Sequence, residues 1–548
     1  MTRRDTPHPP ANVVCPGDVP VGFAREVHRS DRRWAWLGVV GAVLVLAGGS
    51  WYQAWVTPPY RYIDEQAHTG YVLSLQDGRL PTIDAPIDGA AGGDALRERL
   101  ATEPARRRDV WVANNPPLAY LLAVPPATIT RVLGVPGGPL LGLRLANVAA
   151  TAGAVALAYL LGRDLAGGDR TVGVTTSALV ALLPHVGFVA ALGFNDGVAL
   201  LATTGTLHAL TALLTTPTPT PTECGVPEPR PRRFRAWGSG DEVGRRAAIL
   251  GLWCAAAAAV RPMALAFAAV AAALALVGTW GRAALVPTIA RLGGPTAVLV
   301  AWWYAANVAR YGDPTGSEAL FDKFLREPSG SLASKLRDNT IWESAFRTIA
   351  TRRTDAPLAS DPVVWFRVAE LVAAVGVVGA VVLVVAGRRR SGAPDGPGGR
   401  TPSPPARAWA AAAVLGAVPV VLTAQHAAGG GNPHPRYLLP AVPVLAAAVA
   451  LATVRLAGRV GAAVLVTALA VLTAAQTRAS ILDLRDHPLA APGSPLAAPV
   501  GTGWVPALGT AAAALGLALV LASLLRPAVV GPGRGDGPSR SAQDPGGA

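Results

Sequence analysis

Apolar segments of membrane-spanning length recur along this chain and limit what it can fold into. Three of them, VVGAVLVLAG at 39–48, LVAAVGVVGAVVLVVAG at 371–387 and AAVLVTALAVLTAA at 462–475, are apolar on all sides rather than along one helical face. Helices of that kind must be surrounded by lipid or protein. Of the 548 residues, 51% are hydrophobic and only 15% are charged. The sequence therefore predicts an all-α polytopic membrane protein rather than a soluble multidomain protein.

Length and hydropathy predict about 12 transmembrane helices, within a range of roughly 11 to 13. One further candidate, 116–134, carries Pro125 and Pro126 in its middle, and each proline removes a backbone donor. We expect this segment to be a re-entrant or surface helix within one long first external loop, 56–138. The predicted spans lie near residues 34–55, 139–162, 171–192, 196–214, 247–260, 262–280, 284–306, 363–387, 408–427, 437–454, 459–475 and 503–525.

The placement of arginine predicts which end of the bundle faces the cytoplasm. Nearly all of the positive charge is arginine, because Lys323 and Lys335 are the only lysines. If residues 116–134 do not cross, the arginine-bearing gaps between spans fall on one side, which the positive-inside rule makes cytoplasmic. This placement explains the net charge of +14 better than nucleic-acid binding does. We expect a multi-pass plasma-membrane protein.

This topology divides the chain into regions with different expected surroundings. The three cysteines have no CxxC spacing and indicate neither a disulfide framework nor a zinc site. The regions are a cytoplasmic tail at 1–33, a transmembrane core at 34–306 with a Pro-rich cytoplasmic linker at 215–246, an external loop at 307–362, C-terminal helices at 363–526 with a cytoplasmic linker at 388–407, and a disordered tail at 527–548.

Unusual polar residues converge on the external end of the predicted bundle. A carboxylate beside lipid costs free energy unless it is wet, paired or bound to a cation, so these residues are candidates for a site. The set comprises Asp64, Glu65 and His68 in the first external loop, Asn195 and Asp196 at the mouth of a span, Arg261 at a turn between two spans, and His434 and Arg436 just before a late span.

Several roles stay open for these residues. If the stretch 62–70 is helical, Asp64 and His68 lie four residues apart on one face, where Asp64 is placed to act as a general base and His68 to orient it or bind a phosphate. A divalent cation held by Asp64 with Asp196 or His68 is an alternative that two or three ligands do not specify. The plainer readings are solvated loop charges for Asp64 and Glu65, helix caps for Asn195 and Asp196, a snorkelling Arg261 and a flanking charge for Arg436.

Five motifs, in order along the chain, resemble those of a known family. They are YIDEQAHTGYVLSLQDGRLP at 62–81, NNPPLAYLL at 114–122, LGFNDGVALL at 192–201, VRPMALAFAAV at 260–270 and NPHPRYLLPAVPVLAA at 432–447. Together they resemble the GT-C polytopic membrane glycosyltransferases of the protein-mannosyltransferase and aminoarabinose-transferase type. The resemblance covers roughly residues 34–450 and implies a GT-C-type bundle with a long first extracytoplasmic loop.

That resemblance implies a function and assigns roles to the candidate residues. The family moves a hexosyl or pentosyl group from a polyprenyl-phosphate donor to an extracytoplasmic glycan, lipid or protein, without a nucleotide sugar. Two departures bear on the phosphate site, since the family's Lys is Arg261 here and the usual Gly before the late Arg is Pro435. The main rival is a transporter or lipid flippase, and a second is an envelope scaffold protein. The implied roles are Asp64 as base with Glu65 beside it, His68, Asn195 and Asp196 in support, and Arg436 and Arg261 on the donor phosphate.

Overall fold

The computed structural model describes residues 21–62, 64–135, 137–216, 239–281, 284–351, 404–485 and 504–526, with isolated residues between 374 and 381. In this part of the chain every element is a helix, and Pro86 with Asp109 forms an isolated bridge rather than a strand. The predicted tail at 527–548, the linker 388–407 except its last residues, and most of the linker 215–246 lie outside the described residues. The predicted all-α class is confirmed.

The described residues form both α-helices and short 3-10 helices. The α-helices are α1 (Val21–Val56), α2 (Glu65–Gln76), α3 (Gly89–Gly92), α4 (Asp94–Thr102), α5 (Leu118–Val132), α6 (Gly138–Leu165), α7 (Arg170–Leu182), α8 (Pro184–Ala190), α9 (Asp196–Leu214), α10 (Ser239–Ala258), α11 (Pro262–Thr279), α12 (Leu285–Leu299), α13 (Ala301–Tyr311), α14 (Ser317–Lys323), α15 (Leu332–Leu336), α16 (Asn339–Thr351), α18 (Pro404–Ala428), α19 (Val442–Arg485) and α20 (Trp504–Leu525), and the 3-10 helices are η1 (Ala105–Arg107), η2 (Trp111–Asn114) and η4 (Pro435–Ala441).

The long helices account for the predicted membrane spans. Among the described residues, seven segments are long and apolar enough to cross a membrane: α1, α6, α9, α11, α18, η4 with α19, and α20. The bent pairs α7–α8 and α12–α13 raise this number to nine if each pair is one span. Each predicted span coincides with one of these helices or with α10, except 363–387, which lies almost wholly outside the described residues. The chain is a multi-pass membrane protein, and its total of about 12 spans stays a prediction.

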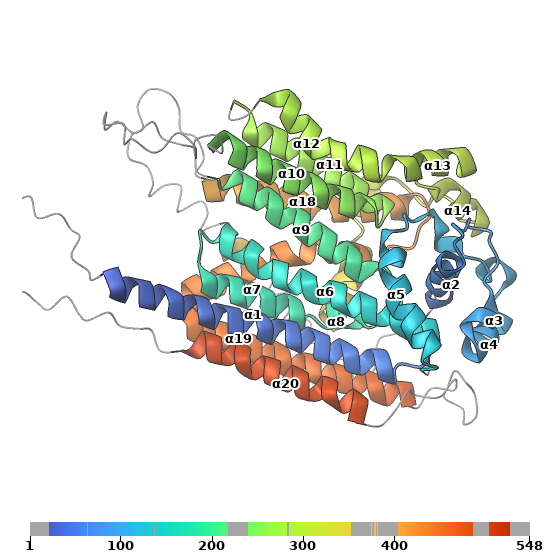
Figure 1. Cartoon of the computed structure of the whole chain (residues 1–548), viewed down its shortest axis with the longest axis horizontal. Helices are drawn as coiled ribbons and strands as arrows, with labels where there is room; N and C mark the ends of the chain where they lie inside the picture. Colours follow the sequence, from blue (N-terminus) through green and yellow to red (C-terminus); the bar gives the residue numbers. More distant parts are fainter. Residues whose placement is uncertain are drawn as a thin grey trace, which may run out of the picture.

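The α5 helix is too short to cross a bilayer unaided. At about 1.5 Å of rise per residue, its 15 residues extend about 22 Å, against roughly 30 Å for the hydrocarbon core. It packs across α6, where Gly142 lies so close to the backbone of Pro126 and Ala127 that a Cβ atom would collide. In Figure 1 this helix lies with α2 at one end of the bundle. Its placement as a surface or re-entrant helix of the first external loop stays a prediction.

The chain reverses direction within the residues of α19. Gly458 has non-helical backbone angles, with φ of 64°. Before it, Arg436 lies over the ring of Phe194, beyond the end of α7 and α8, and Arg455 lies 3.7 Å from Asp169 at the start of α7. After it, Thr473 donates to the carbonyl of Leu182 at the end of α7. The two segments on either side of Gly458 therefore run in opposite directions along α7, as the separate predicted spans 437–454 and 459–475 require.

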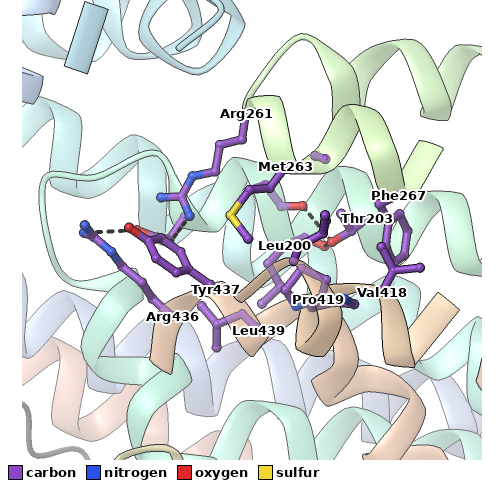
Figure 2. A pocket seen from close by; sticks show the side chains of 15 residues that line it. Leu200, Thr203, Arg261, Met263, Phe267, Val418, Pro419, Arg436, Tyr437 and Leu439 are labelled. Atoms are coloured by element: carbon purple, nitrogen blue, oxygen red, sulfur yellow. Dashed lines mark hydrogen bonds and ion pairs between the residues drawn. The ribbon is translucent and has the colours of Figure 1, made fainter. Parts of the chain in front are cut away.

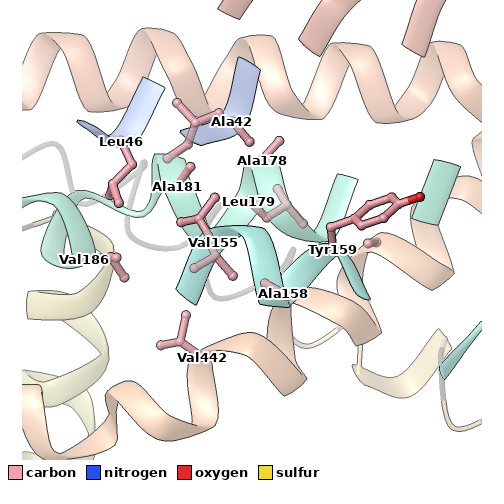
Figure 3. Packing of buried hydrophobic residues seen from close by; sticks show 14 of the residues in the cluster. Ala42, Leu46, Val155, Ala158, Tyr159, Ala178, Leu179, Ala181, Val186 and Val442 are labelled. Atoms are coloured by element: carbon pink, nitrogen blue, oxygen red, sulfur yellow. The ribbon is translucent and has the colours of Figure 1, made fainter. Parts of the chain in front are cut away.

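The first and last described helices pair along their lengths. Ser523 donates to the carbonyl of Trp34 at 2.8 Å, and the indole of Trp51 donates to Val505 at 3.1 Å. The pairing of 34 with 523 and of 51 with 505 makes α1 and α20 antiparallel, as Figure 1 also shows. Behind them, small and branched side chains from α1, α6, α7 and α19 fill the main core, including those shown in Figure 3.

The two ends of the bundle differ in structure. In Figure 1 the short helices α2 to α5, together with α13 and α14, gather at one end, where the first loop and the 307–351 segment meet. Lys323 ties these two segments together, since its ammonium lies 2.7 Å from Asp84 and 2.6 Å from Asp109. The turn between α6 and α7, the helices that contain Arg163 and Arg170, lies at the opposite end in Figure 1. The candidate site residues all lie at the end with the short helices.

Candidate active site

Asp64 stands immediately before α2 in an uncommon backbone conformation. Its φ is 87°, a value that most side chains avoid and that Asp and Asn tolerate best after Gly. The side chain is 13% exposed, and its Oδ2 accepts a hydrogen bond of 2.7 Å from Nη2 of Arg436. The first loop and the residues before α19 therefore meet at this carboxylate.

Arg436 joins Asp64 to a second carboxylate, that of Asp196. Nη1 of Arg436 lies 3.9 Å from Oδ2 of Asp196, and Nη1 of Arg261 lies 2.7 Å from Oδ1. Arg261 also donates through Nε to Oδ1 of Asn195 at 2.8 Å. The side chain of Asp196 is only 1% exposed. Two carboxylates and two guanidiniums thus alternate in one set, which we call the charged cluster: Asp64, Arg436, Asp196 and Arg261.

The contacts of Asn195, Arg261 and Arg436 differ from those of a helix cap, a snorkelling arginine and a flanking charge. Asn195 is the residue before α9, yet its side chain makes no capping hydrogen bond to that helix and instead accepts from Arg261. The Arg261 side chain is 14% exposed and turns into the bundle toward Asp196 instead of snorkelling to water. Arg436 also lies over the ring of Phe194, at 4.9 Å from its centroid. Charges this buried are paired with one another because solvent cannot stabilise them.

Glu65 adjoins Asp64 but faces a different partner. It is fully buried and forms a two-pronged ion pair with Arg144 of α6, with Nε to Oε1 and Nη2 to Oε2 both at 2.9 Å. The backbone amide of Gly193 donates to the same carboxylate at 3.0 Å. The ion pair fixes the start of α2 against α6. The remaining Arg144 donors reach the backbone oxygens of Ala54, Thr57 and Pro58 at 2.8–3.1 Å.

His68 lies one helical turn after Asp64, as the four-residue spacing predicts. Its backbone amide donates to the Asp64 carbonyl at 3.0 Å, and its Nδ1 lies 2.9 Å from the hydroxyl of Tyr120 in α5. The ring also packs near Phe194, with centroids 5.3 Å apart. Burial lowers the pKa of His68 from its ordinary 6.5 to about 3. The imidazole is therefore neutral at physiological pH.

An apolar pocket opens beside the charged cluster. Figure 2 shows Arg261 and Arg436 at one end of it and Phe267 and Val418 at the other. The space between these walls, together with the open solvent at its mouth, amounts to about 460 Å³. This arrangement suits a ligand with an anionic head and an apolar tail. The remaining walls come from α9, α11, α18 and the residues before α19: Asp196, Ala199, Leu200, Thr203, Met263, Ala264, Pro419, Leu422, Tyr437, Leu439 and Pro440.

The divalent cation considered from the sequence stays a prediction. Asp64 and Asp196 each contact arginine, and Nδ1 of His68 contacts Tyr120. Within the described ranges, no group of three or more His, Cys, Asp or Glu side chains is placed to hold a metal ion. The guanidinium N–H groups of Arg261 and Arg436 are hydrogen-bond donors, and they are better suited to an anion than to a cation.

Two contacts of the site were not anticipated from the sequence. Arg144 lies near the start of the predicted span 139–162, and an ionisable residue inside an apolar block is a signal in its own right. Tyr120 belongs to the NNPPLAYLL segment, but no local pattern indicates that its hydroxyl meets His68. The other site residues predicted from the sequence converge, apart from Glu65, which faces Arg144, and His434, which lies beside Tyr437 with ring centroids 6.3 Å apart.

No family model and no curated protein sequence matches the chain. Among solved structures it is similar to ArnT from Cupriavidus metallidurans in the apo state, with 13% identity, a TM-score of 0.46 and coverage of 87% of this chain and 74% of that chain. For the same protein bound to undecaprenyl phosphate, the identity is 12% and the TM-score 0.45, with coverage of 92% of this chain and 77% of that chain. The chain is also similar to the oligosaccharyltransferase AglB from Archaeoglobus fulgidus, in complex with an inhibitory peptide and a dolichol-phosphate. Here the identity is 14% and the TM-score 0.40, with coverage of 80% of this chain and 55% of that chain.

These solved structures are GT-C membrane glycosyltransferases, the kind of protein that the five sequence motifs resemble. Likeness at such low identity and TM-score specifies neither a substrate nor a reaction. The residues of the site must carry that inference.

Proposed function

We propose that this protein is a membrane glycosyltransferase that moves a sugar from a polyprenyl-phosphate donor to an acceptor hydroxyl. The observation that carries the proposal is the junction of the charged cluster with the apolar pocket. Arg261 and Arg436 line the same pocket as Leu200, Met263 and Phe267. A polyprenyl phosphate has a matching division between an anionic phosphate and an apolar chain. The sequence motifs support the same reaction class independently of this geometry.

The two arginines are suited to the donor phosphate. A guanidinium presents a planar fork of donors that matches phosphate oxygens, and it stays charged at any physiological pH. In the structure, Arg436 contacts Asp64 at 2.7 Å and Arg261 contacts Asp196 at 2.7 Å. A bound phosphate competes with these carboxylates for the guanidiniums. Binding at Arg436 thereby releases Asp64 for chemistry.

Asp64 then serves as the general base in a single displacement. The acceptor oxygen attacks the anomeric carbon and forms the new glycosidic bond, while its proton passes to Asp64. The bond between the anomeric carbon and the phosphate oxygen breaks, and the polyprenyl phosphate leaves with the electron pair. The arginines stabilise the negative charge on that leaving group. One displacement of this kind inverts the anomeric carbon.

Glu65 acts in this scheme through position rather than chemistry. Its carboxylate is fully buried and uses both oxygens on Arg144. The pair holds the start of α2, and hence the backbone of Asp64, against α6. We propose this positioning role in place of the direct catalytic one expected from the acidic pair in the sequence.

The site is proposed to face the extracytoplasmic side of the plasma membrane. Arginine-bearing turns, such as the one after Arg163, lie at the end of the bundle opposite the charged cluster. The positive-inside rule places that end in the cytoplasm. The acceptor would then be a glycan, lipid or protein of the cell envelope.

Transfer can be separated from lipid movement in proteoliposomes supplied with a radiolabelled polyprenyl-phosphate sugar and a cell-envelope acceptor fraction. A glycosyltransferase places label on the acceptor, whereas a flippase only moves labelled lipid between leaflets. We expect Arg436→Met to lower transfer by about tenfold to a hundredfold, because a charge-assisted phosphate contact is lost. The matched control is Arg455→Met at the opposite end, whose side chain is 50% exposed and which should transfer normally. Label that moves between leaflets without reaching an acceptor would rule out the transferase.

A further inference from the structure

Tyr120 lies behind His68 in a buried aromatic stack. Its ring is nearly parallel to that of Tyr71, with centroids 3.9 Å apart and an interplanar angle of 9°. The hydroxyl of Tyr71 in turn donates to the carbonyl of Asn115 at 3.2 Å. Tyr120 is fully buried, and this burial raises the pKa of its hydroxyl. Tyr120 therefore keeps its proton, and its ring has little freedom to turn.

The contact between Tyr120 and His68 determines where the imidazole proton lies. The Tyr120 hydroxyl has one proton to donate, and Nδ1 of His68 lies within reach at 2.9 Å. If Nδ1 carried a proton, it would donate to the hydroxyl oxygen, and the Tyr120 proton would have no acceptor in the described part of the chain. A buried donor without an acceptor loses its hydration and gains nothing in return. The neutral ring therefore carries its proton on Nε2.

The imidazole borders the charged cluster. The ring of Phe194 lies beside both, with its centroid 5.3 Å from that of His68 and 4.9 Å from the guanidinium carbon of Arg436. Its Nδ1 is taken by Tyr120, and no described residue accepts a hydrogen bond from Nε2. An N–H group at this place can donate to an oxygen of a bound ligand. Being neutral, it adds no third cation to the two arginines.

We infer that Tyr120 is a positioning residue that holds His68 as the Nε2–H tautomer, and that this N–H donates to an oxygen of the sugar-phosphate donor at the charged cluster. The second half of this inference rests on the proposed function, whereas the tautomer itself does not. It gives the motif histidine a defined role as a neutral hydrogen-bond donor, and it assigns Tyr120 a role that acts only through that histidine.

Two substitutions of His68 distinguish the roles of its two ring nitrogens. The amide nitrogen of Gln reaches the place of Nε2, whereas that of Asn reaches the place of Nδ1. We expect His68→Asn to lower sugar transfer by at least about tenfold and His68→Gln to stay within about threefold of wild type. Equal transfer by the two variants would overturn the role of the Nε2 donor.

Tyr120→Phe tests whether Tyr120 acts through the tautomer. Without the hydroxyl, His68 populates both neutral tautomers, and transfer by the single variant should fall severalfold. Gln has no tautomers, so adding Tyr120→Phe to His68→Gln should cause no further loss. A merely structural Tyr120 would lower transfer by the same factor in both backgrounds, and that result would contradict the inference.

The tautomer can also be read without any transfer assay. In the ¹⁵N NMR spectrum of protein labelled with ¹⁵N-histidine, the His68 signal is assigned by its loss in His68→Gln. We expect this signal to show Nε2 protonated and Nδ1 unprotonated. In Tyr120→Phe the signal should become a mixture. A proton on Nδ1 in the wild type would overturn the inference even in an active enzyme. If wild-type protein shows the Nε2–H form but transfers no label, the proposed function fails and the positioning role of Tyr120 stands.

Discussion

At the scale of single residues, burial and pairing give two neighbouring carboxylates different capacities. The Asp64 side chain is 13% exposed and meets Arg436 through one oxygen, whereas Glu65 is fully buried and meets Arg144 through both. A partly exposed carboxylate beside a pocket can give up its partner when a ligand arrives. A buried two-pronged pair cannot separate without leaving an unpaired charge in the interior. Asp64 is thus suited to chemistry and Glu65 to structure.

Glu65→Gln is expected to lower stability rather than leave a folded but inactive protein. The substitution leaves the Arg144 guanidinium, which is only 3% exposed, without a counter-charge, and this lowers the free energy of unfolding by about 3–5 kcal/mol. The control is Glu242→Gln, whose 35% exposed carboxylate pairs with Arg245 and should cost no more than about 1 kcal/mol. Thermal unfolding in detergent measures both. A Glu65→Gln protein as stable as wild type but unable to transfer sugar would restore Glu65 to a catalytic role.

His68 should make the folded protein sensitive to acid. Its pKa falls from 6.5 in the unfolded chain to about 3 on folding because the ring is buried. Protons then bind more readily to the unfolded state, so this stability is fully present above pH 6.5 and is lost between pH 6.5 and 3. The loss approaches about 1.4 kcal/mol per pH unit. Unfolding measured from pH 7.5 to 5 should show a shallower slope for His68→Gln than for wild type, and equal slopes would count against a buried neutral histidine.

The sequence predicted the types of the site residues better than their partners. An acidic pair and a histidine next to a span are recognisable locally, since apolar surroundings make them conspicuous. The partner of Asp64 lies 372 positions away, and that of Glu65 lies 79 positions away. Two adjacent carboxylates can each face either arginine, and only the path of α6 and the residues before α19 decides between them. Single-chain periodicity holds no information on such pairings.

At the scale of helices, close backbone contact between α1 and α20 depends on glycine. A Cβ atom at Gly41 would lie 2.5 Å from the carbonyl oxygen of Gly516 and 2.9 Å from the amide nitrogen of Val520. At Gly49, in the same helix, a Cβ atom would meet nothing within 4 Å. Small residues of this kind let membrane helices approach closely and gain packing contacts.

Two alanine substitutions in α1 should therefore have opposite effects. Gly41→Ala forces the helices apart and should destabilise the protein by about 1–3 kcal/mol. Gly49→Ala gains helix propensity in open space and should be neutral or stabilising by up to about 1 kcal/mol. Detergent unfolding of the two variants in parallel measures the difference. Equal effects at both positions would mean that α1 and α20 are not in backbone contact.

The helices themselves were largely predictable because apolar blocks are local features. The positions at which these helices bend or end were less predictable from the sequence. The predicted span 171–192 is bent by 63° between α7 and α8, where Pro184 begins the second helix and the residue before it is extended. The proline was visible in the sequence, but whether it bends, ends or merely starts a helix depends on neighbours. Likewise, α1 begins at Val21, inside the tail predicted for 1–33.

At the scale of the whole molecule, the bundle separates the end that holds the charged cluster from the end that holds the turn between α6 and α7. The charged cluster draws on the first loop, the start of α9, the turn before α11 and the residues before α19, so its assembly requires most of the fold. The apolar pocket leads away from that cluster between α9, α11 and α18. A lipid-linked donor can thus place its phosphate at one end of the bundle while its chain stays among apolar side chains.

The most direct test of this account compares two Asp→Asn variants in α2 and its flank. Asp64→Asn keeps a residue that tolerates the φ of 87° and removes only the charge. Asp77→Asn, at the other end of α2, changes a carboxylate that is 43% exposed and paired with Arg79. Transfer from a radiolabelled polyprenyl-phosphate sugar should fall by at least about a hundredfold in Asp64→Asn, as expected for a lost general base, with membrane abundance unchanged, and should stay at wild-type level in Asp77→Asn. Wild-type transfer by Asp64→Asn would contradict the assignment of Asp64 as the base.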